Sequence, residues 1–144
     1  MGLYRLGNAR TDEQLADMRR LEADGVCLFC PEILADQKIV HRAEHWTVTP
    51  NKFPYAGTRL HLLLVPDEHV ADILDLSPEA QADFWSVLAW VREEYQLTYY
   101  GLGSRNGDFE YTGSTISHVH VHVLVGDVEN PEHKPVRMKF SSRP

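Results

Sequence analysis

The chain has 144 residues, which fits one domain with a hydrophobic core, and its formal net charge is −7. This charge argues against a broad surface for nucleic acid, although it allows a local pocket for one nucleotide. No apolar run approaches the roughly 20 residues of a membrane helix, and the start of the chain lacks the apolar core of a signal peptide. We therefore expect a cytoplasmic protein with neither a membrane nor nucleic acid as a partner. A flexible segment over residues 1–10 should precede a single domain over residues 11–144.

A first helix is followed by a pair of cysteines. Thr11 is typical of a helix N-cap, and apolar residues at helical spacing continue to Gly25. Cys27 and Cys30 come next, at a spacing that either holds a metal in a tight turn or forms a redox pair. Redox motifs of this kind usually begin a helix after a strand, whereas this pair follows a helix and precedes Pro31. We favour a metal site, with a redox pair or two buried structural cysteines as alternatives.

The middle of the chain alternates between strand patterns and one long helix. The most apolar run ends at Pro66 and contains one polar side chain, His61, which such strands often keep as a hydrogen-bonded core residue. Ser77 and Pro78 form a strong helix start, and this helix should extend to about Gln96. Neighbouring strands with one helix across them predict an α+β fold with an antiparallel sheet. The expected strands cover residues 39–40, 46–49, 60–66, 97–103, 118–125 and 136–140.

Three histidines alternate with valines in the last buried strand, at positions 118, 120 and 122. Successive side chains of a strand point to opposite faces, so the imidazoles share one face and the valines bury the other. Imidazole can act as an acid, a base, a nucleophile or a metal ligand. Two further interpretations are a half-exposed strand that uses histidine as its polar residue, and a catalytic metal site with three imidazoles. The polar, glycine-containing loop over residues 105–115 leads into this strand and suits a phosphate.

The segment over residues 118–124 resembles the signature of the histidine triad family, in which three histidines alternate with apolar residues. Cys27-Leu28-Phe29-Cys30 resembles the Cys-x-Phe-Cys that opens many bacterial members. Residues 61–69 resemble the strand in which a histidine and four apolar residues precede Pro-x-x-His, although Leu60 stands where relatives have glycine. The resemblance covers the chain from about residue 27 to residue 125. It implies a nucleotide hydrolase or transferase that acts on the α-phosphate of nucleotide conjugates.

The resemblance implies a catalytic role for four residues. His120, the middle imidazole, would attack the α-phosphate and become transiently nucleotidylated, which splits one displacement into two. His122 would hydrogen-bond the phosphate oxygens and stabilise charge as it develops. His61 would join the same cluster, and Thr115 would donate to the phosphate or to the leaving group.

The resemblance also implies substrate-binding residues. Asn51, in a loop that resembles the ribose-contacting loop of the phosphorylase-like branch, would hold the ribose. Gly113 and Ser114 stand where the family has Gly-Gln before a hydroxyl residue, so that a shorter side chain replaces the amide. Arg105 lies where many relatives have asparagine, and it would either clamp a phosphate through two N–H groups or face solvent.

A structural zinc is the one cofactor that the resemblance implies, with no organic cofactor. In zinc-containing members, the two cysteines, the histidine after the proline and the first triad histidine bind the metal. These positions are Cys27, Cys30, His69 and His118 in this chain. Two sulfur and two nitrogen ligands make a closed tetrahedral set with no open position for water, which argues against the three-imidazole catalytic metal.

The implied architecture has an antiparallel sheet, one long helix across it and an additional N-terminal helix. Relatives commonly form homodimers through the long helix and the strand beside it, and Trp85 and Trp90 would suit either that interface or the core. The expected substrates are adenosine phosphoramidates or dinucleoside polyphosphates. The alternatives are a phosphorylase or adenylyltransferase, a nucleotide-binding sensor with low turnover, and a scaffold stabilised by zinc.

Overall fold

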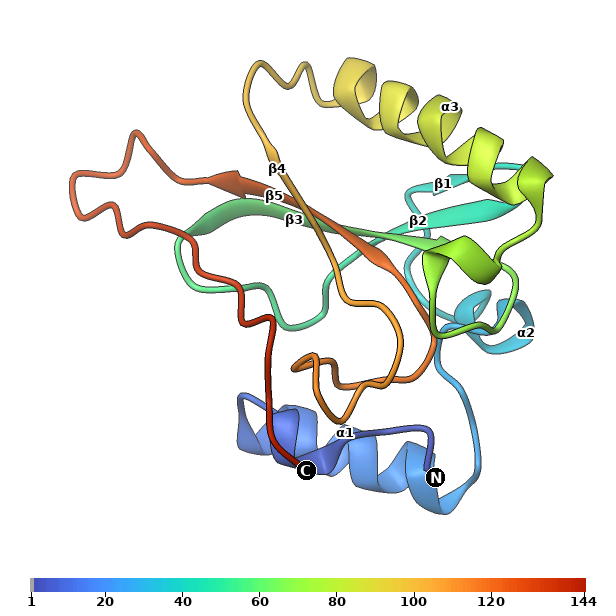
Figure 1. Cartoon of the computed structure of the whole chain (residues 1–144). Coiled ribbons are helices and arrows are strands. Elements are labelled where there is room, and N and C mark those ends of the chain that lie inside the picture. The colour runs from blue at the N-terminus through green and yellow to red at the C-terminus, as the bar shows by residue number, and fades with distance from the viewer. Residues whose placement is uncertain (1) are drawn as a thin grey trace.

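A five-stranded antiparallel sheet forms the centre of the protein, with the strand order β1-β2-β3-β5-β4 (Figure 1). The computed structural model describes residues 2–144. In the middle of the sheet, Leu62 of β3 lies opposite Val123 of β5, and Leu63 lies opposite His122. The prediction of an α+β fold with an antiparallel sheet is confirmed. The strands are β1 (His41–Arg42), β2 (Trp46–Pro50), β3 (Thr58–Pro66), β4 (Gly101–Ser104) and β5 (Val121–Gly126).

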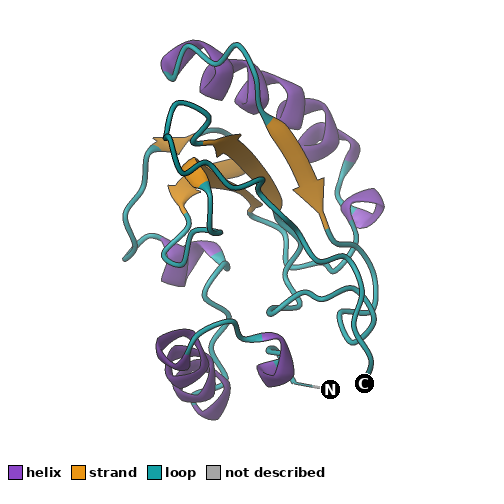
Figure 2. Cartoon of the chain, turned by 90° about the vertical axis from the view of Figure 1, so that its left-hand side faces the viewer, coloured by secondary structure: helices purple, strands orange, loops and turns teal. Residues whose placement is uncertain are grey.

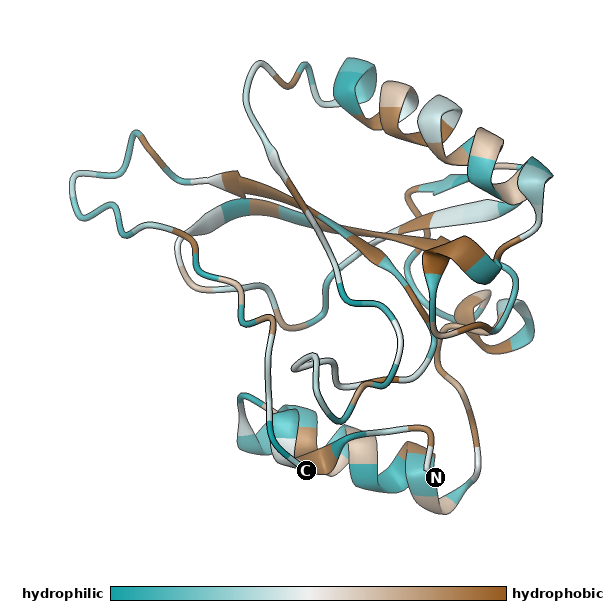
Figure 3. Ribbon diagram, in the orientation of Figure 1, coloured by the Kyte–Doolittle hydropathy of each residue, from teal (hydrophilic) through white to brown (hydrophobic). Residues whose placement is uncertain are grey.

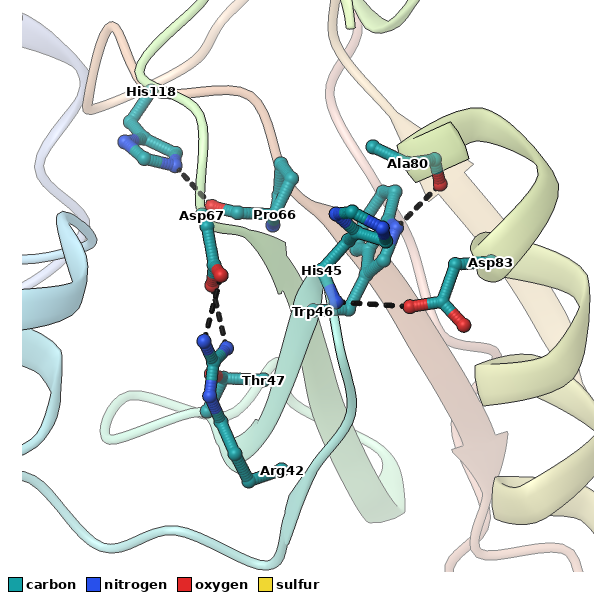
Figure 4. Close-up of polar contacts among 9 residues, drawn as sticks. All are labelled: Arg42, His45, Trp46, Thr47, Pro66, Asp67, Ala80, Asp83 and His118. Atoms are coloured by element: carbon teal, nitrogen blue, oxygen red, sulfur yellow. Dashed lines mark hydrogen bonds and ion pairs between the residues drawn. The ribbon is translucent and has the colours of Figure 1, made fainter. Parts of the chain in front are cut away.

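Helix α3 (Pro78–Glu94) covers one face of this sheet (Figure 2). The Ser77 side chain caps its first turn by accepting a hydrogen bond from the Ala80 N–H at 3.1 Å. The Trp46 indole donates from Nε1 to the Ala80 carbonyl at 2.7 Å, which ties β2 to the helix (Figure 4). Strands β3 and β5 are hydrophobic over much of their length (Figure 3). The core between helix and sheet includes Trp46, Val48, Leu62, Leu64, Phe84, Val87, Val91, Val121, Val123 and Val125.

Segments from both ends of the chain lie over the opposite face of the sheet. The 3-10 turn η1 (Leu6–Asn8) leads into helix α1 (Asp12–Ala23), and the short helix α2 (Pro31–Leu34) follows the cysteine pair. The C-terminal tail lies beside the N-terminal segment that precedes α1 (Figures 1 and 2). A second, smaller apolar cluster joins these segments to the sheet and includes Tyr4, Met18, Phe29, Leu34, Leu63, Val65 and Ile116.

The N-terminal segment is hydrogen-bonded to the stretch that precedes the histidines. The Arg5 N–H donates to the Thr115 carbonyl and the Ser117 N–H donates to the Leu3 carbonyl, each at 2.9 Å. The flexibility of residues 1–10 remains a prediction, and the first of these residues lies outside the described part of the chain.

Two expected strands differ from the structure. β5 begins at Val121, so the prediction of a strand that starts at residue 118 is wrong for the first three residues. The Val119 N–H donates to the Val70 carbonyl at 2.8 Å, in a loop, and is therefore not available for pairing with a strand. The prediction of a strand over residues 136–140 is also wrong, because this segment runs as a tail without strand pairing.

The other elements lie close to their predicted positions. The first hairpin strand is shifted to residues 41–42, and β4 begins at residue 101, later than expected. Of the two tryptophans on α3, Trp85 is 67% exposed, whereas Trp90 packs against the core and stacks on His41. None of the helices in residues 2–144 has both the length and the apolar character needed to cross a bilayer.

Candidate active site and metal centre

Two cysteines and two histidines from separate parts of the chain meet beside the sheet. Cys27 and Cys30 lie between α1 and α2, His69 follows β3, and His118 precedes β5. Their ligand atoms all lie within 4.8 Å of one another. The Nδ1 atoms of the two histidines are 3.2 Å apart, and each is within 3.6 Å of a cysteine Sγ. Zinc–nitrogen bonds of about 2.0 Å and zinc–sulfur bonds of about 2.3 Å in a tetrahedron require similar separations, so this set fits zinc.

The ring of His118 is oriented as a metal ligand requires. Its Nε2 lies 2.7 Å from the Pro66 carbonyl, to which only a protonated nitrogen can donate (Figure 4). The lone pair of the neutral ring is therefore on Nδ1, the atom that faces the cysteines. Burial lowers the pKa of His118 to about 4 and raises the pKa of Cys30 to about 12. A neutral imidazole is ready to bind a cation, whereas the thiol needs the cation before it loses its proton.

The middle imidazole lies next to this quartet and borders a cavity of about 770 Å³. His120 donates from Nδ1 to the carbonyl of His118 at 2.9 Å, so the lone pair of its neutral ring is on Nε2. Burial lowers the pKa of His120 to about 4, and the ring packs edge-on against Phe29 with centroids 4.9 Å apart. His120 is thus a neutral imidazole with an available lone pair at the wall of a cavity.

The protons of His61 and His122 can be placed from one backbone hydrogen bond. The Tyr55 N–H donates to His61 Nδ1 at 3.1 Å, so the proton of neutral His61 lies on Nε2. That nitrogen lies 2.7 Å from Nδ1 of His122, which must therefore accept, and the proton of His122 lies on its own Nε2. Burial lowers the pKa of both rings, that of His61 to about 3, so both are neutral.

This arrangement of protons leaves the buried Nε2–H of His122 without an acceptor. His122 is 3% exposed, it borders the cavity, and its Nε2 has no hydrogen-bond partner among the described residues. An unsatisfied buried N–H group costs about 1–3 kcal/mol, and such groups are rare in folded proteins. An oxygen atom of a ligand in the cavity would satisfy it.

Most of the predicted substrate-binding residues border the same cavity. Asn51 Oδ1 accepts from the Phe53 N–H at 2.8 Å, and Asn51 Nδ2 lies 3.2 Å from His61 Nε2. Both of these nitrogens carry protons in the order given above, so their contact is not a hydrogen bond. Gly113 also borders the cavity, as does Thr115, for which a catalytic role is predicted. Gly113 has a φ of +83°, and a Cβ atom there would lie 3.0 Å from Lys139 Cε, so both its backbone conformation and the close tail favour glycine.

Arg105 and Ser114 differ in their positions. Arg105 borders the cavity and donates from Nη2 to the Tyr55 hydroxyl at 3.0 Å. Ser114 is buried outside the cavity lining, and its hydroxyl donates to the Ile116 carbonyl at 2.9 Å. The structure therefore brings Arg105 to the candidate site, whereas Ser114 is buried outside the cavity and bonds to the backbone.

Three residues of the site could not be identified from the sequence. The ring of Tyr55 stacks on His122 with centroids 5.4 Å apart. Tyr55 follows Asn51 in the loop that resembles a ribose-contacting loop, but that resemblance implies a role for Asn51 alone. Arg10 and Lys139 come from the two ends of the chain and also border the cavity. Neither of these two lies in a motif or a periodic segment, so only the tertiary structure reveals them.

Comparisons with known proteins agree with this architecture. A family model described as HIT domain matches residues 33–129. No curated protein matches the chain. Among solved structures, a HIT family hydrolase from Clostridium thermocellum is 24% identical, with a TM-score of 0.58 over 74% of this chain and 95% of its own.

Two other solved structures have the same fold. A zinc-bound histidine triad family protein from Mycobacterium smegmatis is 22% identical, with a TM-score of 0.55 over 78% of this chain and 82% of its own. A histidine triad nucleotide-binding protein from Candida albicans is 17% identical, with a TM-score of 0.59 over 78% of this chain and 85% of its own.

Proposed function

Because this chain belongs to the HIT domain family, we propose that it is a nucleotide hydrolase or transferase that acts at an α-phosphate through a covalent adduct on His120. One observation supports this most strongly. The lone pair on Nε2 of His120 and the unsatisfied Nε2–H of His122 belong to neighbouring rings, 4.9 Å apart, at the wall of one cavity. A phosphate group bound there would meet a nucleophile and a hydrogen-bond donor together.

The proposed reaction has two displacements. Nε2 of His120 attacks the α-phosphorus, and the bond from phosphorus to the leaving group breaks, with its electron pair going to the leaving group. The Nδ1–H of His120 stays on the carbonyl of His118, which stabilises the cationic ring of the adduct. Water then attacks phosphorus, the phosphorus–nitrogen bond breaks with its electron pair returning to Nε2 of His120, the proton of the attacking water passes to solvent, and a nucleoside monophosphate leaves. The His122 N–H stabilises the negative charge on the phosphate oxygens in both steps.

We propose that zinc binds at Cys27, Cys30, His69 and His118. It would cross-link the turn after α1 to the segment that carries His120, and four protein ligands would close its coordination sphere. In this proposal the chain's own imidazoles perform the phosphoryl chemistry. Small nucleotide conjugates are the substrates, of which adenosine phosphoramidates and dinucleoside polyphosphates are the candidates.

A homodimer is part of the proposal. Trp85 on α3 is 67% exposed and Leu102 on β4 is 46% exposed, and β4 is an edge strand of the sheet. Exposed apolar side chains and an unpaired strand edge are each typical of surfaces that pair with another chain. Light scattering should give a dimer mass for the protein and a monomer mass for Trp85→Glu, whereas a monomer mass for both would contradict the dimer.

A single-turnover experiment tests the activity. The protein is mixed with adenosine 5′-phosphoramidate or diadenosine tetraphosphate, and mass spectrometry reads free AMP and protein-bound AMP. We expect an AMP adduct in the wild type and none in His120→Ala. His133→Ala is the matched control, because this histidine is exposed in the loop after β5, and it should retain the adduct.

The outcomes separate the alternatives. Release of AMP by water indicates a hydrolase, whereas release of ADP when inorganic phosphate is present indicates a phosphorylase. Nucleotide binding without adduct or product would indicate a sensor and contradict the proposed activity. Unchanged AMP release in His120→Ala would show that His120 is not the nucleophile.

A further inference from the structure

Positively charged side chains border the cavity although the chain as a whole is acidic. Arg10 precedes α1, Arg105 follows β4, and Lys139 lies in the C-terminal tail. The formal net charge of the chain is −7, so this grouping is a local property of the cavity. Cations that gather around a concave site raise the local concentration of anions.

These three cations have no acidic partner. Among residues 2–144, none of the three has a carboxylate within 4.0 Å. Asp17 is the one carboxylate among the residues that line the cavity, and it is paired with Arg20 at 3.3 Å and with Lys52. The positive charges of Arg10, Arg105 and Lys139 are therefore not neutralised by the protein.

Neutral partners hold the three cations in place. The Arg10 guanidinium lies 4.6 Å from the centroid of the Tyr55 ring, and it also donates to the Phe53 carbonyl. Arg105 donates to the hydroxyl of the same tyrosine at 3.0 Å and from Nε to the Lys139 carbonyl at 2.7 Å. Lys139 Nζ donates to Asn8 Oδ1 at 3.0 Å. Partners of this kind orient a cation and leave its charge available.

This arrangement is adjacent to the imidazoles. Tyr55 contacts both Arg10 and Arg105, and its ring stacks on His122. The Nε2–H of His122 is the buried donor without an acceptor. The charges of Arg10 and Arg105 reach the ring of His61 as well, since both contribute to lowering its pKa after the larger effect of burial. Arg10 and Arg105 thus lie close to the imidazoles at which a phosphate would bind.

Two of the three cations come from segments outside the matched family range. Arg10 lies before residue 33 and Lys139 lies after residue 129. These segments are bonded to each other through Lys139 and Asn8, and through the Arg5 side chain, which donates to the Arg143 carbonyl at 2.9 Å. Arg10 and Lys139 are therefore contributed by segments outside the matched family range, whereas Arg105 lies within it.

We infer that Arg10, Arg105 and Lys139 form a second anion subsite, which binds the phosphates beyond the α-phosphate and makes nucleotide conjugates with a polyphosphate leaving group the preferred substrates. This inference rests on the proposed function. When Nε2 of His120 attacks the α-phosphorus, the bond to the bridging oxygen breaks and the polyphosphate leaves with the electron pair. Unpaired cations stabilise the charge that it gains.

Nucleotide binding tests the subsite without any chemistry. Dissociation constants of AMP and ATP are measured by calorimetry on His120→Ala, which lacks the nucleophile. We expect ATP to bind about tenfold more tightly than AMP, because its two additional phosphates meet the cations. Arg10→Gln or Lys139→Gln in this background should reduce that ratio to about two, whereas Arg10→Lys, which keeps the charge, should retain most of it.

Arg59→Gln is the matched control. Arg59 is an exposed cation outside the cavity lining, so its loss changes the net charge equally and should leave the ratio unchanged. Thermal unfolding of each variant shows whether it is folded. An ATP affinity no higher than that of AMP, or a ratio that falls as much in Arg59→Gln, would overturn the subsite.

Substrate selectivity tests the second part. The ratio of kcat/KM for diadenosine tetraphosphate over adenosine 5′-phosphoramidate should exceed one in the wild type and fall about tenfold in Arg10→Gln. A wild type that prefers the phosphoramidate would overturn the inference while its His120 adduct still supported the proposed function. Tight ATP binding with no adduct from either substrate would have the opposite meaning, since the subsite would stand and the proposed reaction would fail.

Discussion

The two faces of the central sheet come from the same strands and have opposite chemistry. On β5, Val121 and Val123 face α3 and are 3% and 0% exposed, while His122 between them faces the cavity. On β3, Leu62 and Leu64 pack under the helix, while His61 lies on the imidazole side. Because successive side chains of a strand point to opposite faces, neighbouring residues of β3 and β5 contribute to the apolar core and to the imidazole side.

This difference shows how the domain tolerates buried imidazoles. Burying neutral imidazoles that must keep polar atoms available is unfavourable, and the donor of His122 is not satisfied at all. The apolar residues on the α3 side provide the free energy that holds these strands in register. Stability and activity should therefore respond separately when one face or the other is changed.

The largest expected effect is on activity, at the imidazole face. His120→Ala should reduce AMP release at least about 1000-fold, because the covalent route disappears with the nucleophile. Its free energy of unfolding should change by only about 1 kcal/mol, the typical value of one hydrogen bond. Single-turnover assays and urea denaturation of the same preparation measure both. A His120→Ala variant that loses most of its stability together with its activity would contradict the separate roles of the two faces.

Removal of zinc should lower the stability of the protein, because the proposed site joins the turn after α1 to the segments that flank β3 and β5. Zinc present at about 1000 times its dissociation constant should stabilise the folded protein by about 4 kcal/mol, because the unfolded chain lacks the assembled site. Thermal unfolding after chelation, with and without added zinc, checks this. Cys30→Ser should unfold at a lower temperature than the wild type and respond little to zinc. Equal unfolding temperatures of the chelated and zinc-loaded wild type would contradict the site.

The apolar face should show a loss of stability without a loss of chemistry. Leu64 is 0% exposed in the core under α3, so Leu64→Ala should lower the free energy of unfolding by about 3 kcal/mol through lost burial and a cavity. The rate of AMP release per folded molecule should stay near that of the wild type. Leu74→Ala, at a position that is 77% exposed, is the control and should change stability by less than about 0.5 kcal/mol. A comparable loss of activity per folded molecule in Leu64→Ala would show that the faces are coupled.

The smallest expected effect comes from the N-cap residues of α1 and α3, whose loss should change stability equally but KM differently. Thr11 caps α1 by accepting from the Gln14 N–H at 3.0 Å, as Ser77 caps α3. Either substitution to alanine should lower the free energy of unfolding by about 1 kcal/mol. Only Thr11→Ala should also raise KM, by about threefold, because α1 is part of the cavity wall. Equal KM values for the two variants would remove α1 from the substrate site.

Local patterns in the sequence predicted much of this architecture. The cap and spacing of Ser77 predicted α3, the apolar run before Pro66 predicted β3, and the alternation around His120 predicted that valines and imidazoles separate. These features depend on neighbours within a few residues, which periodicity records. The strand expected over residues 136–140 failed because alternation alone supplies no partner, and this segment pairs with no strand although β4 is an edge strand of the sheet.

The sequence by itself determined which chemical groups the protein has and in which segments they lie. The four residues that can bind zinc and the three imidazoles at residues 61, 120 and 122 were all identifiable from their spacing and from the family resemblance. Only the tertiary structure decided where each proton lies, since one backbone N–H from Tyr55 sets the order from His61 to the free donor of His122. The tertiary structure alone also brought Arg10 and Lys139 to one cavity from opposite ends of the chain. Such contacts join residues more than a hundred positions apart, and no local pattern encodes them because they arise only when distant segments pack together.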